Sequence, residues 1–299
     1  MISYNDIIEV QIEGKNFFKV KLAKFLFNLQ CSTFESSINK NIGKKIFFKI
    51  IVCKINSLEI FKNKNKEIFI NLKIDNPYNV VLSYVLQIWS IINNYLIIHG
   101  GIYQKNSLNF ILTGKGGVGK TFKIITACLN KEQLFMGDDL VLLNGNKAIP
   151  IIRPICLYPE HIKINKLKPF IKEKIIKRNI IFLKIKRKLL CYLSALIPKF
   201  DFLYFKSYQN EFSNLSWAYV PPKKIGMKVN YDPVKLSGFI TLVRKNKEVE
   251  ESNFAKDIIQ STEYEFNIFN KELDYLTNYF HSKSFNKYIS EKIQEVNIE

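Results

Sequence analysis

The residues best suited to chemistry form a glycine-rich segment with the pattern G-x-x-x-x-G-K-[ST]. Its members are Gly114, Lys115, Gly116, Gly117, Val118, Gly119, Lys120 and Thr121. Glycines let successive backbone N–H groups turn towards phosphate oxygens, and a helix beginning near Lys120 adds the positive end of its dipole to the same place. Lys120 would then reach the β- and γ-phosphates, and Thr121 would offer its hydroxyl to Mg²⁺. The pattern predicts a nucleotide site; a glycine-rich turn with an incidental lysine is the alternative.

Two adjacent carboxylates provide the acidic groups that such a site needs. Asp138 and Asp139 follow Gly137 and precede an apolar run over 140–143. One carboxylate can hold Mg²⁺ and the other can accept a proton from an attacking hydroxyl. Neighbouring side chains of a strand point to opposite faces, so both reach one site only from a strand end or a turn, and Gly137 permits such a bend. The alternative is that one of them is merely solvated or a cap.

Two further polar residues are candidates for the same site. His99 precedes two glycines at the end of an apolar stretch, where an imidazole could orient a catalytic Asp or touch a phosphate. Arg153 closes a hairpin whose turn is 144–146, and its guanidinium could stabilise charge on a transferred phosphate. The alternatives are a structural polar role for His99 and a surface ion pair for Arg153.

Apolar periodicity predicts the elements that must position these residues. Alternation of apolar and polar side chains makes the first 75 residues mostly β-strand, and helical spacing predicts a core helix before His99. A strand before the glycine-rich segment and a helix after it are the context that phosphate binding requires. The expected strands cover 44–55, 68–74, 96–104, 108–113 and 239–243, with hairpin turns at 62–66 and 105–107, and the expected helices cover 79–94 and 122–129, with helical spacing again over 266–280.

The composition excludes disorder as the main state, because 47% of the 299 residues are apolar and 24% are charged. A net charge of +19 favours an acidic partner, although compositional drift is the alternative. The clearest local cluster is 163–188, where Glu173 is the single acid among many Lys and Arg residues. A basic amphipathic helix there could bind an acidic peptide or an anionic membrane surface, or simply cover the core. Nucleic acid ranks lower as a partner because no nucleic-acid motif accompanies the cluster, and a homo-oligomer is left open.

The five cysteines are far apart and show no metal or redox spacing, which indicates buried thiols in a reducing cytoplasm. The amino terminus has no basic segment followed by an apolar run and a cleavage site, so no export is signalled. The most apolar window, 80–98, is interrupted by Gln87, Asn93 and Asn94, which favours a core helix over a membrane span. We expect a cytoplasmic protein, with peripheral membrane contact through 163–188 as a variant.

The order of these motifs resembles the catalytic core of the HPr kinase/phosphorylase family and its relatives. The matching pieces are residues 97–100, the glycine-rich segment and residues 137–142, within a region of about 79–154. The resemblance implies an α/β fold (α+β, mixed sheet) with a phosphoenolpyruvate-carboxykinase-like P-loop core. It implies a β-rich amino-terminal region over 1–78 and a kinase-like domain over 79–299, with a basic helical insertion at about 160–200.

The same resemblance implies roles for the site residues. Lys120 and Thr121 take the nucleotide and magnesium roles, and His99 matches the active-site histidine. Asp138 is the expected base and Asp139 the expected metal ligand, with the reverse division left open. The chain has no Arg-Gly dipeptide, which the HPr enzymes carry for phosphorolysis, so HPr is not the expected substrate. It is more similar to relatives such as the lasso-peptide precursor kinases, which phosphorylate a Ser hydroxyl on a peptide.

The expected activity is transfer of the γ-phosphate of ATP, with Mg²⁺, to a hydroxyl, in the first place a Ser of a peptide or protein. Two alternatives stay open. One is a kinase of a small-molecule hydroxyl. The other is a non-catalytic module that binds a nucleotide and docks a partner. The sequence supplies neither the identity of the acceptor nor the preference for ATP over other nucleotides.

Overall fold

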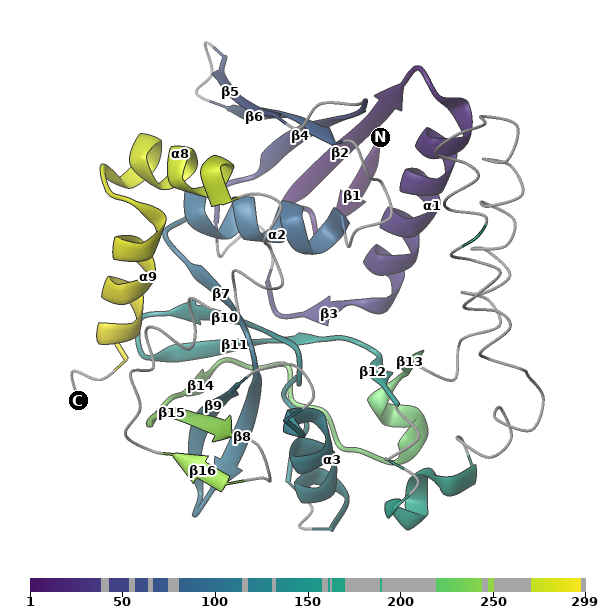
Figure 1. Cartoon of the computed structure of the whole chain (residues 1–299), viewed down its shortest axis with the longest axis vertical. Coiled ribbons are helices and arrows are strands. Elements are labelled where there is room, and N and C mark those ends of the chain that lie inside the picture. The colour runs from purple at the N-terminus through teal and green to yellow at the C-terminus, as the bar shows by residue number, and fades with distance from the viewer. Residues whose placement is uncertain are drawn as a thin grey trace.

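The amino-terminal region folds as a five-stranded sheet in the computed structural model of the chain (Figure 1). The strands are ordered β1 (Ile2–Tyr4), β2 (Ile8–Gly14), β4 (Ile46–Val52), β6 (Ile68–Ile74) and β5 (Ser57–Lys62). The three central strands are parallel, and β1 and β5 are antiparallel edges. The strand periodicity expected in this region is confirmed, since alternate side chains of β2 and β4 are buried.

The structure describes most of the chain, in segments. They are residues 1–38, 43–53, 57–63, 67–74, 81–114, 118–130, 133–157, 161, 163–169, 189, 219–243, 247–249 and 270–296. Most of the basic cluster therefore lies outside the described residues, and its predicted amphipathic helix stays a prediction. In the described part, no helix is long and apolar enough to cross a membrane.

One helix of the amino-terminal region was missed by the sequence analysis, which expected mainly strands there. Helix α1 (Phe17–Thr33) follows β2, and the side chain of Asn16 accepts the backbone N–H of Lys19 at 3.0 Å at its start. The error came from the alternation of apolar residues with lysines over 17–22, which imitates a strand. The buried residues reveal the helical period instead, and they are Leu22, Ala23, Leu26 and Phe27.

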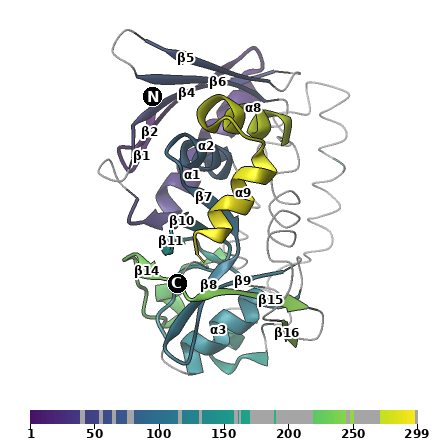
Figure 2. The same cartoon turned by 90° about the vertical axis from the view of Figure 1, so that its left-hand side faces the viewer.

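The expected core helix is confirmed as α2 (Val81–Ile92), which lies between the amino-terminal sheet and the next one (Figures 1 and 2). Trp89 is fully buried and donates its indole N–H to the Lys44 carbonyl at 3.0 Å. From the other end of the chain, helix α8 (Asn270–His281) packs on α2, and α9 (Phe285–Gln294) packs on α8. The Tyr288 hydroxyl donates to the carbonyl of Tyr95, directly before strand β7 (Leu96–His99). The carboxyl-terminal helices thus anchor the strand that ends at His99.

Two further sheets contain the strands next to the candidate site residues. One has the order β14 (Val234–Lys235), β11 (Lys147–Ile152), β10 (Leu140–Asn144) and β7 (Leu96–His99), with β3 (Glu35–Ser36) also paired to β11. The other has the order β16 (Lys247–Val249), β15 (Gly238–Val243), β9 (Leu108–Thr113) and β8 (Gly101–Lys105). Strands β9 and β15 are parallel and the remaining pairs of these two sheets are antiparallel. The described chain thus combines helices with sheets of mixed strand direction, in agreement with the expected α/β (α+β) class.

The apolar run over 96–104, expected as one strand, divides at Gly100 into β7 and β8, which belong to different sheets. The hairpins at 105–107 and 144–146 form as expected, and the former has left-handed residues Asn106 and Ser107. Helix α3 (Lys120–Asn130) follows the glycine-rich segment, as predicted. Short elements complete the described chain: β12 (Ile155–Cys156), β13 (Tyr219–Val220) and the 3-10 turns η2 (Asn165–Leu167) and η3 (Pro222–Ile225).

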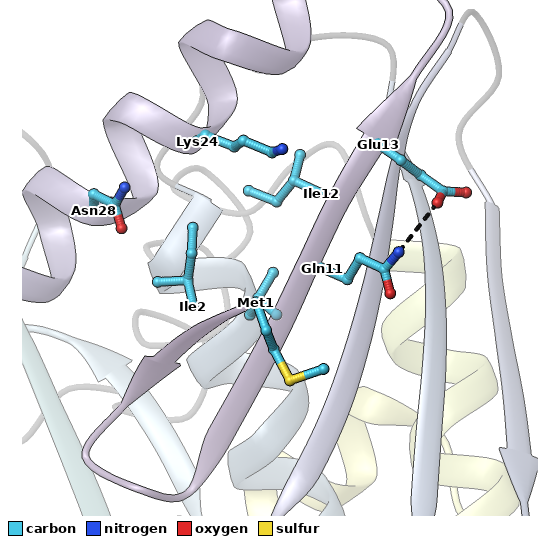
Figure 3. A pocket seen from close by; sticks show the side chains of 8 residues that line it. Met1, Ile2, Gln11, Ile12, Glu13, Lys24 and Asn28 are labelled. Atoms are coloured by element: carbon cyan, nitrogen blue, oxygen red, sulfur yellow. Dashed lines mark hydrogen bonds between the residues drawn. The ribbon is translucent and has the colours of Figure 1, made fainter.

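A groove of about 520 Å³ lies where β1 stops short of the full length of β2 (Figure 3). Lys24 and Asn28 of α1 line it together with Ile2 and Ile12. None of the candidate site residues lines this groove. The chemistry predicted from the sequence is therefore not located at this groove.

Gly101 permits the close crossing of β8 over the segment before β10. A Cβ atom at Gly101 would lie 2.7 Å from the Asp138 Cα and 2.8 Å from the Gly137 carbonyl oxygen. These are backbone atoms that cannot move aside cheaply, so we predict that Gly101→Ala lowers the free energy of unfolding by about 2 kcal/mol. Urea unfolding measures it.

The control is Gly145→Asn in the hairpin turn. Gly145 has a φ of 58° with open space around it, and Asn tolerates this backbone conformation. We expect a change within about 0.5 kcal/mol for the control. Equal stability of Gly101→Ala and the wild type would contradict the close crossing.

Candidate functional site

The glycine-rich segment connects β9 to α3 and begins at a position that only glycine can occupy. Gly114 has a φ of 133°, and a Cβ atom there would lie 2.5 Å from the Leu242 carbonyl oxygen. Gly119, directly before α3, also has a left-handed φ, of 100°. Lys115, Gly116 and Gly117 lie outside the described residues. The described ends of the segment, Gly114 and Gly119, therefore lie at the amino end of a helix, where backbone N–H groups have no partner within the helix.

Lys120 is a buried cation at the first position of α3. Its residue is 7% exposed, and its Nζ donates to the Gly114 carbonyl at 2.6 Å. The ammonium group thus reaches back to the start of the glycine-rich segment. When a phosphate binds there, the ammonium group would donate to phosphate oxygens in place of this carbonyl. Phosphate oxygens are the stronger acceptors because they are charged.

Asp138 and Asp139 lie at a bend immediately before β10. The sequence analysis expected such a position, because two adjacent side chains can serve one site only from a strand end or a turn. Gly137 has a φ of 97°, and its carbonyl accepts the N–H of Ile102 at 3.2 Å. The Asp139 carbonyl accepts the N–H of Gly100 at 3.1 Å. These two backbone hydrogen bonds fix the bend against the junction of β7 and β8. The acidic pair is therefore positioned by the division at Gly100 that the sequence did not reveal.

Both carboxylate oxygens of Asp139 are engaged. His99 Nε2 lies 3.1 Å from Oδ1, and Arg153 Nη1 donates to Oδ2 at 2.6 Å. Burial would raise the pKa of Asp139, but the Arg153 guanidinium, the His99 hydrogen bond and the charge of Lys120 outweigh it and hold that pKa well below its ordinary range. Asp139 is consequently a permanent anion at neutral pH, although 39% of its side chain reaches solvent.

Asp138 has the opposite behaviour. It is 6% exposed, and its side chain hydrogen-bonds with Thr121 of α3. Burial, followed by the negative charge of Asp139, raises the pKa of Asp138 to about 7, against lowering contributions from Arg153, Thr121 and His99. A carboxylate with such a pKa gains and loses its proton near neutral pH, which is the property a general base needs.

His99 lies at the end of β7 and is 8% exposed. Asp139 is an anion, so Nε2 carries a proton and donates to it. Within the described structure, the other ring nitrogen, Nδ1, is buried without a hydrogen-bond partner.

The structure thus brings together Lys120, Thr121, Asp138, Asp139, His99 and Arg153. One neighbour was missed by the sequence analysis: the ring of Phe34, whose centroid lies 4.8 Å from the Arg153 Cζ. No motif marks Phe34, and only the pairing of β3 with β11 brings it there.

The oxygen donors of the site suit Mg²⁺, which prefers carboxylate, hydroxyl and phosphate oxygens. Thr121 and the acidic pair could hold it with phosphate oxygens completing the coordination. Within the described residues, no three His, Cys, Asp or Glu side chains are grouped so as to hold a metal without such help. A comparison of the chain with protein-family models and with curated proteins found no match in either.

The pKa of Asp138 predicts a pH-dependent effect on stability. Between its ordinary value of 3.8 and about 7, the folded protein binds more protons at Asp138 than the unfolded chain does. This residue therefore lowers the free energy of unfolding as pH rises from 5 to 8. We predict that Asp138→Asn stabilises the protein by at least about 1 kcal/mol more at pH 8 than at pH 5.

Urea unfolding in buffer with EDTA and without nucleotide measures this difference. Asp232→Asn makes the same chemical change at an exposed residue and is expected to have the same effect at both pH values. An Asp138→Asn effect that is identical at pH 5 and pH 8 would show that Asp138 is ionised in the same way in the folded and unfolded states.

Proposed function

We propose that this chain is a kinase that transfers the γ-phosphate of ATP to a hydroxyl, that of a Ser side chain of a peptide or protein. The observation that carries the proposal is the contrast within the acidic pair. Asp138, beside the first turn of α3, has a pKa of about 7, and Asp139 next to it stays ionised. A hydroxyl nucleophile needs a base with the first property, and the Mg²⁺ that accompanies a nucleotide needs a carboxylate that stays ionised.

The nucleotide would bind at the amino end of α3. Backbone N–H groups of the glycine-rich segment would surround the phosphates, and the Lys120 ammonium would leave the Gly114 carbonyl for the β- and γ-phosphates. When bound, Mg²⁺ would neutralise charge on the transferred phosphate. Thr121 and Asp139 are the residues we assign to it, and each Asp139 oxygen keeps a lone pair in addition to its present hydrogen bond.

Asp138 would act on the acceptor. Its carboxylate accepts the hydroxyl proton as the hydroxyl oxygen forms a bond to the γ-phosphorus, and the bond between the γ-phosphorus and the bridging oxygen breaks to release ADP. Arg153, which donates a hydrogen bond to Asp139, would also stabilise negative charge on the transferred phosphate. His99 holds Asp139 from the other side, and its hydrogen bond helps to keep Asp139 ionised.

The acceptor class rests on the sequence. The motif order resembles that of kinases acting on a peptide Ser, and the cluster over 163–188 supplies a positive charge that suits an acidic peptide. The small-molecule kinase and the non-catalytic nucleotide module remain the competing proposals, and one labelling experiment separates all three.

Purified protein would be incubated with Mg²⁺, γ-labelled ATP and a lysate of its own host, beside a panel of Ser-containing peptides. The peptide-kinase proposal expects label on a peptide or protein, as phosphoserine. Label confined to a metabolite would move the acceptor to a small molecule. ATP binding by calorimetry without any label on peptide, protein or metabolite would support the nucleotide module and reject catalysis.

Asp138→Asn tests the base. The amide has the same shape but accepts no proton, so we predict that kcat falls by at least about a hundredfold while the Kd for ATP stays within about threefold. Steady-state kinetics and calorimetry measure the two quantities. Asp232→Asn is the matched control and should keep both values. Retention of wild-type kcat in Asp138→Asn would remove Asp138 from the chemistry.

Lys120→Met tests the phosphate site. Methionine is an unbranched side chain only one atom shorter but donates no hydrogen bond, so we predict a Kd for ATP at least about tenfold weaker. Lys228→Met, which makes the same change at an exposed residue, serves as control and should bind ATP like the wild type. Unchanged ATP affinity in Lys120→Met would exclude the glycine-rich segment as the phosphate site.

A further inference from the structure

The amino-terminal region reaches the candidate site through one aromatic ring. We infer that Phe34 is a positioning residue that holds the Arg153 guanidinium against Asp139, so that the amino-terminal region completes the catalytic site. The catalytic part of this inference rests on the proposed kinase function, whereas the holding of Arg153 can be tested without it. Neither of the sequence motifs, the glycine-rich segment or the acidic pair, identifies Phe34 as a site residue.

The guanidinium of Arg153 is held from two sides. Its Cζ lies 4.8 Å from the centroid of the Phe34 ring, and its Nη1 donates to Asp139 at 2.6 Å. The contact with the ring restricts the plane of the guanidinium, and the hydrogen bond restricts the direction in which its Nη1 points. The two contacts together therefore fix the orientation of the group. Phe34 is 6% exposed and the Arg153 side chain 12%, so little water competes for either contact.

Backbone pairing explains why this ring meets this cation. Strand β3 pairs antiparallel with β11, with Ser36 opposite Ile151 and Glu35 opposite Ile152. The next position in the same register sets Phe34 opposite Arg153. The contact is therefore built by a strand pair that ends at the site, and α1 leads directly into it.

The position of Arg153 matters because it faces Asp139, which neighbours the proposed base. The turn that follows β11 does not by itself direct a long arginine side chain, whose many rotamers are costly to restrict. Stacking on a buried ring restricts them before substrate arrives. Loss of the ring should leave all the other candidate site residues present. The Arg153 guanidinium, however, would be separated from Asp139 for part of the time.

The test compares Phe34→Leu with Phe34→Tyr. Leucine keeps a buried apolar side chain but has no aromatic face, so we expect kcat for phosphate transfer to fall about tenfold while the KM for ATP stays within about twofold. Tyrosine restores the face and should restore kcat to within about twofold of the wild type. Phe48→Leu removes a ring of similar burial in β4 and should lower the thermal midpoint while keeping kcat.

A chemical readout separates this inference from the kinase proposal. Phenylglyoxal modifies arginine side chains, and mass spectrometry of peptides gives the rate at each one. In Phe34→Leu we expect Arg153 to react at least about threefold faster than in the wild type, and in Phe34→Tyr at the wild-type rate. The other arginines of the chain are internal references with unchanged rates, and they are Arg178, Arg187 and Arg244.

The outcomes are distinct. Faster modification of Arg153 in Phe34→Leu, together with a wild-type protein that transfers no phosphate, would reject the kinase proposal and retain the inference that Phe34 holds Arg153. A wild-type rate of modification in Phe34→Leu would overturn the inference, whatever the kinase activity. A kcat that falls in Phe34→Leu but is not rescued in Phe34→Tyr would reduce Phe34 to a packing role and would also overturn it.

Discussion

The ion pair between Arg153 and Asp139 is the interaction on which the candidate site depends. It keeps Asp139 ionised in a place where burial favours the neutral acid, and His99 assists from the second oxygen. The retained charge of Asp139 then helps to raise the pKa of Asp138 to about 7. A fixed anion and a titrating base thus arise from two identical side chains, because one is bonded to cationic and imidazole groups and the other is buried beside it.

This division requires a backbone that turns both side chains towards one region. The bend at Gly137 provides it, and the two hydrogen bonds from Gly100 and Ile102 hold the bend in place. Gly101 has no Cβ to prevent β8 from lying this close. The departure of the chain from one sheet to another at Gly100 is therefore more than a topological detail. It brings the end of β7, with His99, beside the acidic pair.

Much of the layout could be predicted from the sequence, because it depends on local pattern. Alternation and turn residues indicated β2, β4, β6 and the hairpins, and helical spacing indicated α2 and α3. Helix α1 was missed because lysines over 17–22 imitate a strand alternation. The candidate site residues were recognised by type and spacing, but the division of labour between Asp138 and Asp139 depends on burial and on partners distant in sequence. No single-sequence pattern reports those quantities.

Phe34 is the clearest case of a contact that a single-sequence pattern does not report. A phenylalanine after an apolar helix is unremarkable in the sequence, and its distance of more than a hundred positions from Arg153 hides any relation. A two-residue strand pair is enough to join them, since antiparallel register sets the next residues of both strands opposite each other. The segment that resembles a known catalytic core contains Arg153 but not the ring that packs on it. The candidate site residues can therefore be recognised in one quarter of this chain, whereas one contact that orients them, from the Phe34 ring, comes from outside it.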